Sequence, residues 1–397
     1  MVRDELIRRA LDQTNWDLLV CSIPANVLLL SGYWPAVGYS VALATRDGQL
    51  ALVVPDDDDD LAEQSWVDEV VTYEPTPTAH LMTPEDSVYE AFVRMKRDLT
   101  ITADRIGFEQ ADWYEPMSYT PQMLRGSSVR LLRRVFPSAT LAPADELLLE
   151  MRSIKTPAEK EHIRTACRIA EQGFQQASRV LRPGMTEAEA AAACRLPLNA
   201  CLGDFGHVNR CDGFMHCMSG RNSETAFGPY SRSRSRKIER GDVVILRCHC
   251  YADGYWADVT RTYQIGPINE NRKRVFAAVF AARQAALDAM QPGTRGADVD
   301  RAAREVLESH GFGFAFKHPA GHGAGFGATE HVARPRLHPK SDDILKPGMI
   351  LKLEPGVYVE NYGGVRKADI VAITNDRPDV LTPFHWNLEE LTLDEVY

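Results

Sequence analysis

Alternation of apolar and polar positions is clearest between residues 241 and 263. Two strand-like segments lie there, at 243–250 and 255–263, and Ala252-Asp253-Gly254 joins them. A glycine that follows an aspartate between two alternating segments is typical of a β-hairpin. We therefore predict a hairpin here and regard it as the element around which the rest of the chain is organised.

Three ionisable residues of this hairpin fall on one predicted face. Side chains on one face of a strand recur at every second residue, so Arg247 and His249 point the same way, and Asp258 meets them across the turn. Ionisable groups on the inner face of a sheet need a partner, a metal ion or a substrate. This face is therefore the candidate functional site.

The first 150 residues mix short apolar segments with helix-like ones. Helices are predicted at 1–14, 58–66 and 86–99, and strand-like apolar segments lie at 16–21, 27–30, 40–44, 50–54, 69–73 and 105–108. Strands that alternate with helices indicate an α/β domain with a mixed or parallel sheet. We place the end of this domain near residue 150, so that the predicted domains are 1–150 and 151–397.

The remaining residues contain the same pattern twice. Thr156-Pro157-Ala158-Glu159 is a typical helix start, and the helix that it begins stops before Pro183-Gly184. A helix at 271–290 likewise stops before Pro292-Gly293. A second helix and then strands follow each Pro-Gly pair. This pattern predicts an internal duplication, with two α/β halves packed face to face and the site between them.

Composition narrows the possible classes of function. An apolar fraction of 44% and a charged fraction of 25% are ordinary for a globular protein, and a net charge of −10 argues against a nucleic-acid or anionic-membrane partner. The alternating Ser-Arg segment at 231–236 is therefore interpreted as an exposed hairpin rim, and the acidic segment at 56–60 as a solvated loop. Eight cysteines without a C-x-x-C pair indicate free thiols, and the charged N-terminal helix is not a signal peptide. We expect a cytoplasmic protein.

Motifs between residues 150 and 374 add more specific information. They are Arg152-Ser153-Ile154-Lys155-Thr156-Pro157, Gly220-Arg221-Asn222-Ser223, Gly254-Tyr255-Trp256-Ala257-Asp258, Gly321-His322-Gly323, Pro347-Gly348-Met349, Glu354-Pro355-Gly356 and Gly364-Val365-Arg366. In this order they resemble the creatinase, prolidase and aminopeptidase P family. The resemblance implies a pita-bread catalytic domain with halves related by a pseudo-twofold axis, preceded by a smaller α/β N-terminal domain. It also implies a homodimer, because that N-terminal domain often reaches the partner's site.

The resemblance also implies a ligand set for two metal ions, which this chain only partly keeps. Peptidases of the family use two Asp, one His and two Glu residues. Asp258, His322 and Glu354 match three of these positions, but Arg247 and Ala368 stand at the other two. Arginine is always charged and cannot bind a metal. Like charges about 4 Å apart cost about 4 kcal/mol at intermediate dielectric, so we expect no metal cofactor.

One alternative keeps a single ion. Asp258, His322 and Glu354, with His249 nearby, could hold one divalent ion such as zinc, manganese or iron. The competing interpretation is an ion pair between Asp258 and Arg247 in place of a metal. We favour the ion pair.

The family's metal-free branch, creatinase, suggests a function. We predict a metal-independent hydrolase that cleaves a C–N bond (amide, amidine or guanidine type) in a small, carboxylate-bearing metabolite. Two positions depart from creatinase as well, since Phe227 stands in place of its His and Thr260 in place of its Glu. The alternatives are a metal-dependent Xaa-Pro aminopeptidase or dipeptidase with a rearranged metal site, and a non-catalytic ligand-binding protein.

Roles follow from this chemistry. Hydrolysis needs a base for water, an acid for the leaving nitrogen and positive charge near the oxyanion. The catalytic candidates are His322, Glu354 and Asp258, and the substrate-binding candidates are Arg247, His249, His318, His331 and Arg366. His207 and His216 stay open, and further lining residues are expected from the segments 200–235 and 324–340.

Overall fold

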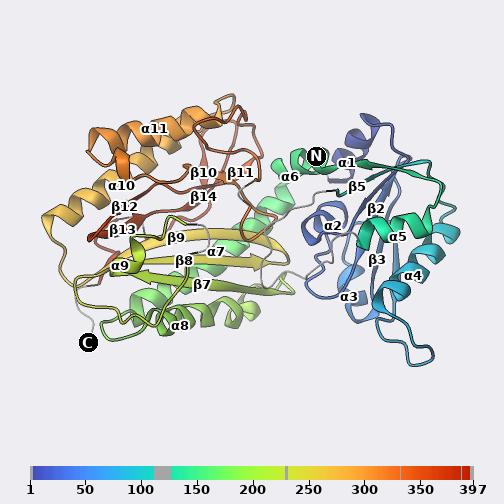
Figure 1. Ribbon diagram of the computed structural model, residues 1–397, viewed down its shortest axis with the longest axis horizontal. Helices are drawn as coiled ribbons and strands as arrows, with labels where there is room; N and C mark the ends of the chain where they lie inside the picture. Colours follow the sequence, from blue (N-terminus) through green and yellow to red (C-terminus); the bar gives the residue numbers. More distant parts are fainter. Residues whose placement is uncertain (1–2, 111–126, 229–230, 331, 386, 394–397) are drawn as a thin grey trace. The chain divides into compact units, whose positions relative to one another are not determined.

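The computed structural model describes residues 3–110, 127–228, 231–330, 332–385 and 387–393 (Figure 1). The chain divides into two compact units, Met1–Arg152 and Ser153–Tyr397. Each unit mixes helices and strands, as the hydrophobic pattern predicts. Among the described residues, no helix combines the length and the apolar character needed to cross a membrane.

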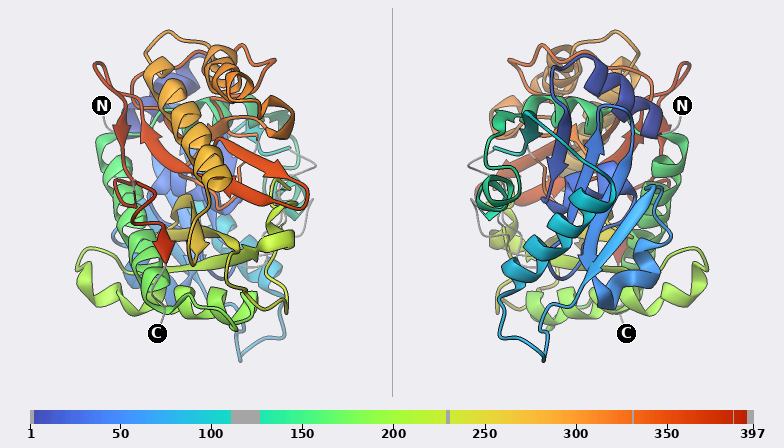
Figure 2. Two further views of the ribbon diagram at one scale, coloured as in Figure 1. Left: turned by 90° about the vertical axis from the view of Figure 1, so that its left-hand side faces the viewer. Right: turned by 90° about the vertical axis from the view of Figure 1, so that its right-hand side faces the viewer.

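The first unit is built on a six-stranded sheet with the order β4-β3-β2-β1-β5-β6. Strand β2 runs antiparallel to both of its neighbours, and the other pairs are parallel. Helix α4 covers one face together with α5, and α2 packs on β1, β2 and β3 (Figure 2, right). The elements are α1 (Arg3–Asp12), β1 (Leu18–Cys21), α2 (Pro24–Ser31), β2 (Val41–Thr45), β3 (Leu50–Pro55), α3 (Asp59–Ala62), β4 (Glu69–Tyr73), α4 (Pro84–Asp98), β5 (Arg105–Phe108), α5 (Ser127–Val135), β6 (Thr140–Pro143) and α6 (Asp145–Ser153).

Two predictions for this unit are wrong. The apolar segment 27–30 lies in helix α2, not in a strand, because Pro24 takes the first helical position and Gly32 ends the helix at φ +77°. A short apolar run does not distinguish a buried strand from a buried helix. The acidic segment 56–60 is not a loop, since it forms a 3₁₀ turn at Asp56–Asp58 and then begins α3.

The second unit stacks two four-stranded sheets between pairs of helices. One sheet has the order β16-β9-β8-β7 and the other β10-β11-β14-β15, with β12 and β13 paired separately. Helices α7 and α8 lie on one side and α10 and α11 on the other (Figure 1). The elements are α7 (Pro157–Val180), α8 (Glu187–Ala200), β7 (Cys211–Ser219), α9 (Gly220–Ser223), β8 (Val243–Ala252), β9 (Tyr255–Ile265), α10 (Glu270–Ala289), α11 (Gly296–Ser309), β10 (Gly321–Gly323), β11 (Ile350–Leu353), β12 (Gly356–Val359), β13 (Gly363–Arg366), β14 (Asp369–Ala372), β15 (Asp379–Val380) and β16 (Thr392–Leu393).

The duplication is visible in the turns that begin each half. Gly184 and Gly293 both adopt positive φ, and each donates its backbone N–H to a later segment of its own half, at Ile238 and Leu345 respectively. A later pair of matching glycines, Gly241 before β8 and Gly348 before β11, also has positive φ. The predicted halves are therefore present, and counting on six residues from these glycines makes Arg247 and Glu354 equivalent positions.

Strands β8 and β9 form the predicted hairpin. Their ladder runs from Val243 opposite Gln264 to Ala252 opposite Tyr255. The two turn residues Asp253 and Gly254 have φ of +48° and +84°, as a two-residue turn of the tight hairpin type requires. This turn fixes the register, and the register decides which side chains share the inner face.

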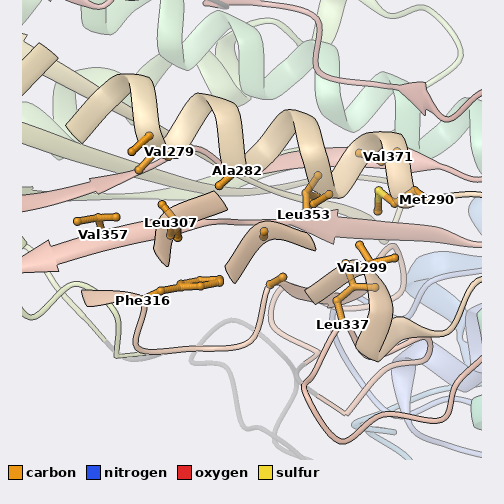
Figure 3. Close-up of a cluster of buried hydrophobic side chains, with 14 of the residues drawn as sticks. Val279, Ala282, Met290, Val299, Leu307, Phe316, Leu337, Leu353, Val357 and Val371 are labelled. Atoms are coloured by element: carbon orange, nitrogen blue, oxygen red, sulfur yellow. The ribbon is translucent and has the colours of Figure 1, made fainter. Parts of the chain in front are cut away.

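The core of the second half lies between the α10–α11 helix pair and the strands beneath it (Figure 3; Figure 2, left). Helix α10 contributes alanines and small β-branched residues at helical spacing, which lets it approach the sheet closely. Side chains from both helices and from β11, β12 and β14 meet there, among them Val279, Ala282, Val299, Leu307, Leu353, Val357 and Val371. This packing holds β11 in place, and β11 leads directly into the site.

A buried ion cluster joins α10 and β9 to β14. Asp369 is fully buried and accepts hydrogen bonds from Arg261 at 2.8 Å and from Arg283 at 2.6 Å. Burial alone would raise the pKa of Asp369, but the two guanidinium groups outweigh it and hold that pKa well below its usual range. The carboxylate is therefore ionised and shared by two buried cations.

Replacing Asp369 with asparagine should destabilise the protein strongly. Two buried arginines would lose their counter-charge, and breaking a buried pair in this way costs about 3–5 kcal/mol. Urea unfolding checks this prediction. The matched control is Asp298→Asn, because Asp298 pairs with exposed arginines; equal unfolding midpoints for the two variants would contradict the assigned role of Asp369.

Candidate functional site

The hairpin face brings Arg247, His249 and Asp258 together, as predicted. His249 lies directly opposite Asp258 in the β8–β9 ladder. Arg247 Nε and Nη2 donate to the two carboxylate oxygens of Asp258 at 3.2 and 2.7 Å. The predicted ion pair is present, and both of its partners are buried.

A second cation, which the sequence analysis missed, lies against the same carboxylate. Lys352 on β11 is completely buried, and its Nζ donates to Asp258 Oδ2 at 2.7 Å. The same Nζ lies 2.7 Å from Glu354 Oε2. The sequence pattern that could have predicted this lysine is the alternation in Ile350-Leu351-Lys352-Leu353-Glu354. It places Lys352 on the same strand face as Glu354.

Arg366 at the end of β13 completes the charged cluster. Its Nη1 lies 3.6 Å from Glu354 Oε2, and only 3% of the residue is exposed. Among the described residues, its Nε and Nη2 have no hydrogen-bond partner. The cluster thus contains three cations (Arg247, Lys352 and Arg366) and two carboxylates, which leaves one positive charge in excess.

This arrangement keeps both carboxylates ionised. Burial alone would raise the pKa of Glu354, but Lys352 and Arg366 hold it well below its usual range. Burial alone would also raise the pKa of Asp258. The nearby Arg247, His249 and Lys352 outweigh this effect and lower the pKa of Asp258. Neither group can therefore donate a proton at neutral pH.

Three of the predicted site histidines, His249, His318 and His322, differ in their partners. His322 on β10 donates from Nδ1 to the carbonyl oxygen of Gly323 at 2.8 Å, and its Nε2 lies 3.9 Å from Glu354 Oε1. His249 donates to the carbonyl of Ala328, and burial lowers its pKa to about 3. His318 has Pro319 O and the Tyr358 hydroxyl as partners, and burial lowers its pKa to about 4.

A cavity of about 320 Å³ opens beside this cluster. Five of the predicted site residues line it, whereas Asp258 and His249 do not. Phe227 comes from one of the two segments that were expected to supply further lining, 200–235, and Arg336, His338 and Lys340 come from the other, 324–340. The lining residues are Phe227, Arg247, His318, Pro319, Gly321, His322, Arg336, His338, Lys340, Ser341, Glu354 and Arg366.

Other predicted residues lie elsewhere. His331 falls outside the described residues. His207 lies 3.2 Å from the Thr165 hydroxyl, and His216 packs edge-on against His249; neither lines the cavity. Residues 231–236 do not form a hairpin, because none of them lies in a strand, and Ser233 accepts a hydrogen bond from the Cys217 backbone of β7.

The fold and this site thus give two duplicated α/β halves with a basic, histidine-bearing cavity between them. The chain belongs to metallopeptidase family M24, whose model matches residues 161–375, and the model of the creatinase/prolidase N-terminal domain matches residues 3–154. The family resemblance inferred from the motifs is therefore confirmed.

Individual relatives agree with this assignment. An Xaa-Pro dipeptidase of Pyrococcus furiosus is 28% identical over 381 residues, which is 96% of this chain and 97% of the relative. An uncharacterized peptidase of Bacillus subtilis is 30% identical over a match that covers 70% of this chain and 72% of the relative. The prolidase of Pyrococcus horikoshii OT3 superposes with a TM-score of 0.77 at 24% identity, over 97% of this chain and 99% of that structure. The predicted pita-bread fold is thereby confirmed.

Two predictions are corrected by these findings. A metal-independent, creatinase-like hydrolase is wrong, because the chain belongs to a metallopeptidase family and its relatives are named Xaa-Pro dipeptidases. The expectation of no metal cofactor is contradicted on the same grounds. The two lost ligand positions carry less weight than the motifs that the chain retains from residue 152 to residue 366.

The described side chains nevertheless do not fit the family's metal pair. Within the described part of the chain, no group of three or more His, Cys, Asp or Glu residues is arranged to hold a metal ion. Lys352 Nζ lies between Asp258 and Glu354. It contacts the carboxylate oxygens that a metal ion bound by both acids would need as ligands. The single-ion set of Asp258, His322 and Glu354 is likewise not assembled in this arrangement, so no chemical step is assigned to a metal here.

Replacing Lys352 with methionine should destabilise the protein. Asp258 and Glu354 would stay buried with one cation fewer, and removing one partner of a buried ion pair costs about 3–5 kcal/mol. The midpoint of urea unfolding at neutral pH measures the effect. Lys346→Met provides the control, because Lys346 is exposed; a Lys352 variant as stable as this control would show that the ammonium is not needed.

Proposed function

We propose that this protein is a peptidase that hydrolyses the peptide bond of short peptides with a free C-terminal carboxylate. Membership of the metallopeptidase family and relatives named Xaa-Pro dipeptidases support the reaction. The cavity supports a small substrate, since about 320 Å³ is at the lower end of volumes found for ligand sites.

The single observation that carries the substrate assignment is Arg366. Its guanidinium is buried in the cavity wall, and two of its nitrogens have no hydrogen-bond partner among the described residues. A buried charged donor without a partner is costly, and a guanidinium matches a carboxylate through two parallel hydrogen bonds. A substrate carboxylate satisfies both requirements at once.

The proposed chemistry uses the remaining cavity residues. His322 Nδ1 is committed to a backbone carbonyl, so in the neutral ring Nε2 carries the lone pair that takes a proton from water. Glu354, held ionised, stabilises the imidazolium that results, and His322 then returns the proton to the leaving nitrogen. Arg247, fixed by Asp258, supplies positive charge near the developing oxyanion.

Replacing Arg366 with glutamine should weaken substrate binding selectively. Losing a hydrogen bond to a charged group costs about 1.5–3 kcal/mol, so we expect KM for free dipeptides to rise about 10- to 100-fold while kcat changes less. Dipeptides with an amidated C-terminus should be poor substrates of the wild-type enzyme and should be affected little by the substitution. Steady-state kinetics with both peptide forms checks this.

The assay must distinguish two failures: that the assigned substrate is wrong, and that the protein is not a peptidase. Xaa-Pro and other dipeptides are offered to the purified protein with manganese, cobalt or zinc added, and again after dialysis against a chelator. Peptide cleavage under any of these conditions supports the proposal. Binding without cleavage under all of them would indicate a ligand-binding protein instead. The homodimer and the cytoplasmic location stay predictions.

A further inference from the structure

A second set of basic side chains lines the cavity beyond Arg366. Arg336, His338 and Lys340 lie on the segment that follows β10. Arg336 forms two hydrogen bonds with Asp343 at 3.0 and 3.3 Å, so its charge is balanced within the protein. Lys340 is exposed and, among the described residues, forms no ion pair.

The cavity therefore carries a net positive charge, whereas the whole chain carries a net negative charge. The protein carries a net charge of −10. The buried cluster has one positive charge in excess, and Lys340 adds a second. Glu354 is the carboxylate in the lining, and Lys352 and Arg366 already neutralise it. A ligand with two negative groups would match the two unbalanced cations.

We propose that the preferred substrates are short acidic peptides that carry two carboxylates. This inference rests on the proposed peptidase function. The C-terminal carboxylate binds Arg366, and the side-chain carboxylate of an Asp or Glu residue is held at the cavity mouth by Lys340. Arg336 and His338 add donors beside it. Because charges at an exposed mouth act mainly on discrimination between ligands, Lys340 determines specificity and takes no part in the bond cleavage.

Near-isosteric peptide pairs test the second carboxylate. Ala-Glu is compared with Ala-Gln, and Glu-Pro with Gln-Pro, so that the acidic residue is tried on either side of the cleaved bond. At low salt we expect kcat/KM to be about two- to fivefold higher for the acidic member of at least one pair, as an exposed ion pair allows. The preference should shrink as salt is raised, because exposed charges are screened.

Lys340→Gln should remove this preference by lowering kcat/KM for the acidic peptide more than for its neutral partner. Lys346→Gln is the matched control, since Lys346 is an exposed lysine of the same segment that does not line the cavity. It should keep the preference of the wild-type protein. A preference that survives Lys340→Gln, or equal turnover of both members of each pair by the wild-type protein, overturns the inference.

Calorimetric binding of the same peptides separates this inference from the proposed function. If no peptide is cleaved but the acidic one binds more tightly in a manner that needs Lys340, the peptidase assignment fails and the dianion site stands. If peptides are cleaved and bound without regard to the second carboxylate, the peptidase assignment stands and the dianion site fails.

Discussion

The site depends on one electrostatic constraint, which is that five charged groups are buried together where the two halves meet. Lys352 Nζ contacts both Asp258 and Glu354, Arg247 binds Asp258 from one side, and Arg366 approaches Glu354 from the other. Each charge is tolerable in a buried position because of its neighbours. The arrangement therefore fixes the ionisation of both acids and leaves Arg366 with donors to offer a ligand.

This cluster also explains how the chain can belong to a metallopeptidase family while its side chains are arranged differently from the family's ligand set. In the duplicated halves, Arg247 and Glu354 are equivalent positions, and the family places acids at both. Here one of the two has become a cation, and a lysine from the neighbouring position occupies the space between the remaining acids. Family membership outweighs the two substitutions as evidence of class.

Much of the fold could be predicted because the signals are local. The Thr156 cap, the Asp-Gly turn at 253–254 and the two Pro-Gly helix ends each fix backbone geometry through nearby atoms. The errors arose where local signals were ambiguous. All four residues at 27–30 are apolar, so their pattern could not distinguish a helix from a strand. Pro24 at the start and Gly32 at the end make this segment a helix.

For the site, the sequence by itself determined which side chains share a strand face, because a side-chain period of two is a property of the strand. That was enough to bring Arg247 and Asp258 together. The resemblance to the family, not the strand period, placed His322, Glu354 and Arg366 at the site. Only the tertiary structure decided that Lys352 reaches both acids and that Lys340 opens onto the same cavity. Those contacts join residues up to 94 positions apart, and such distances are set by how sheets and loops pack together, which no local pattern encodes.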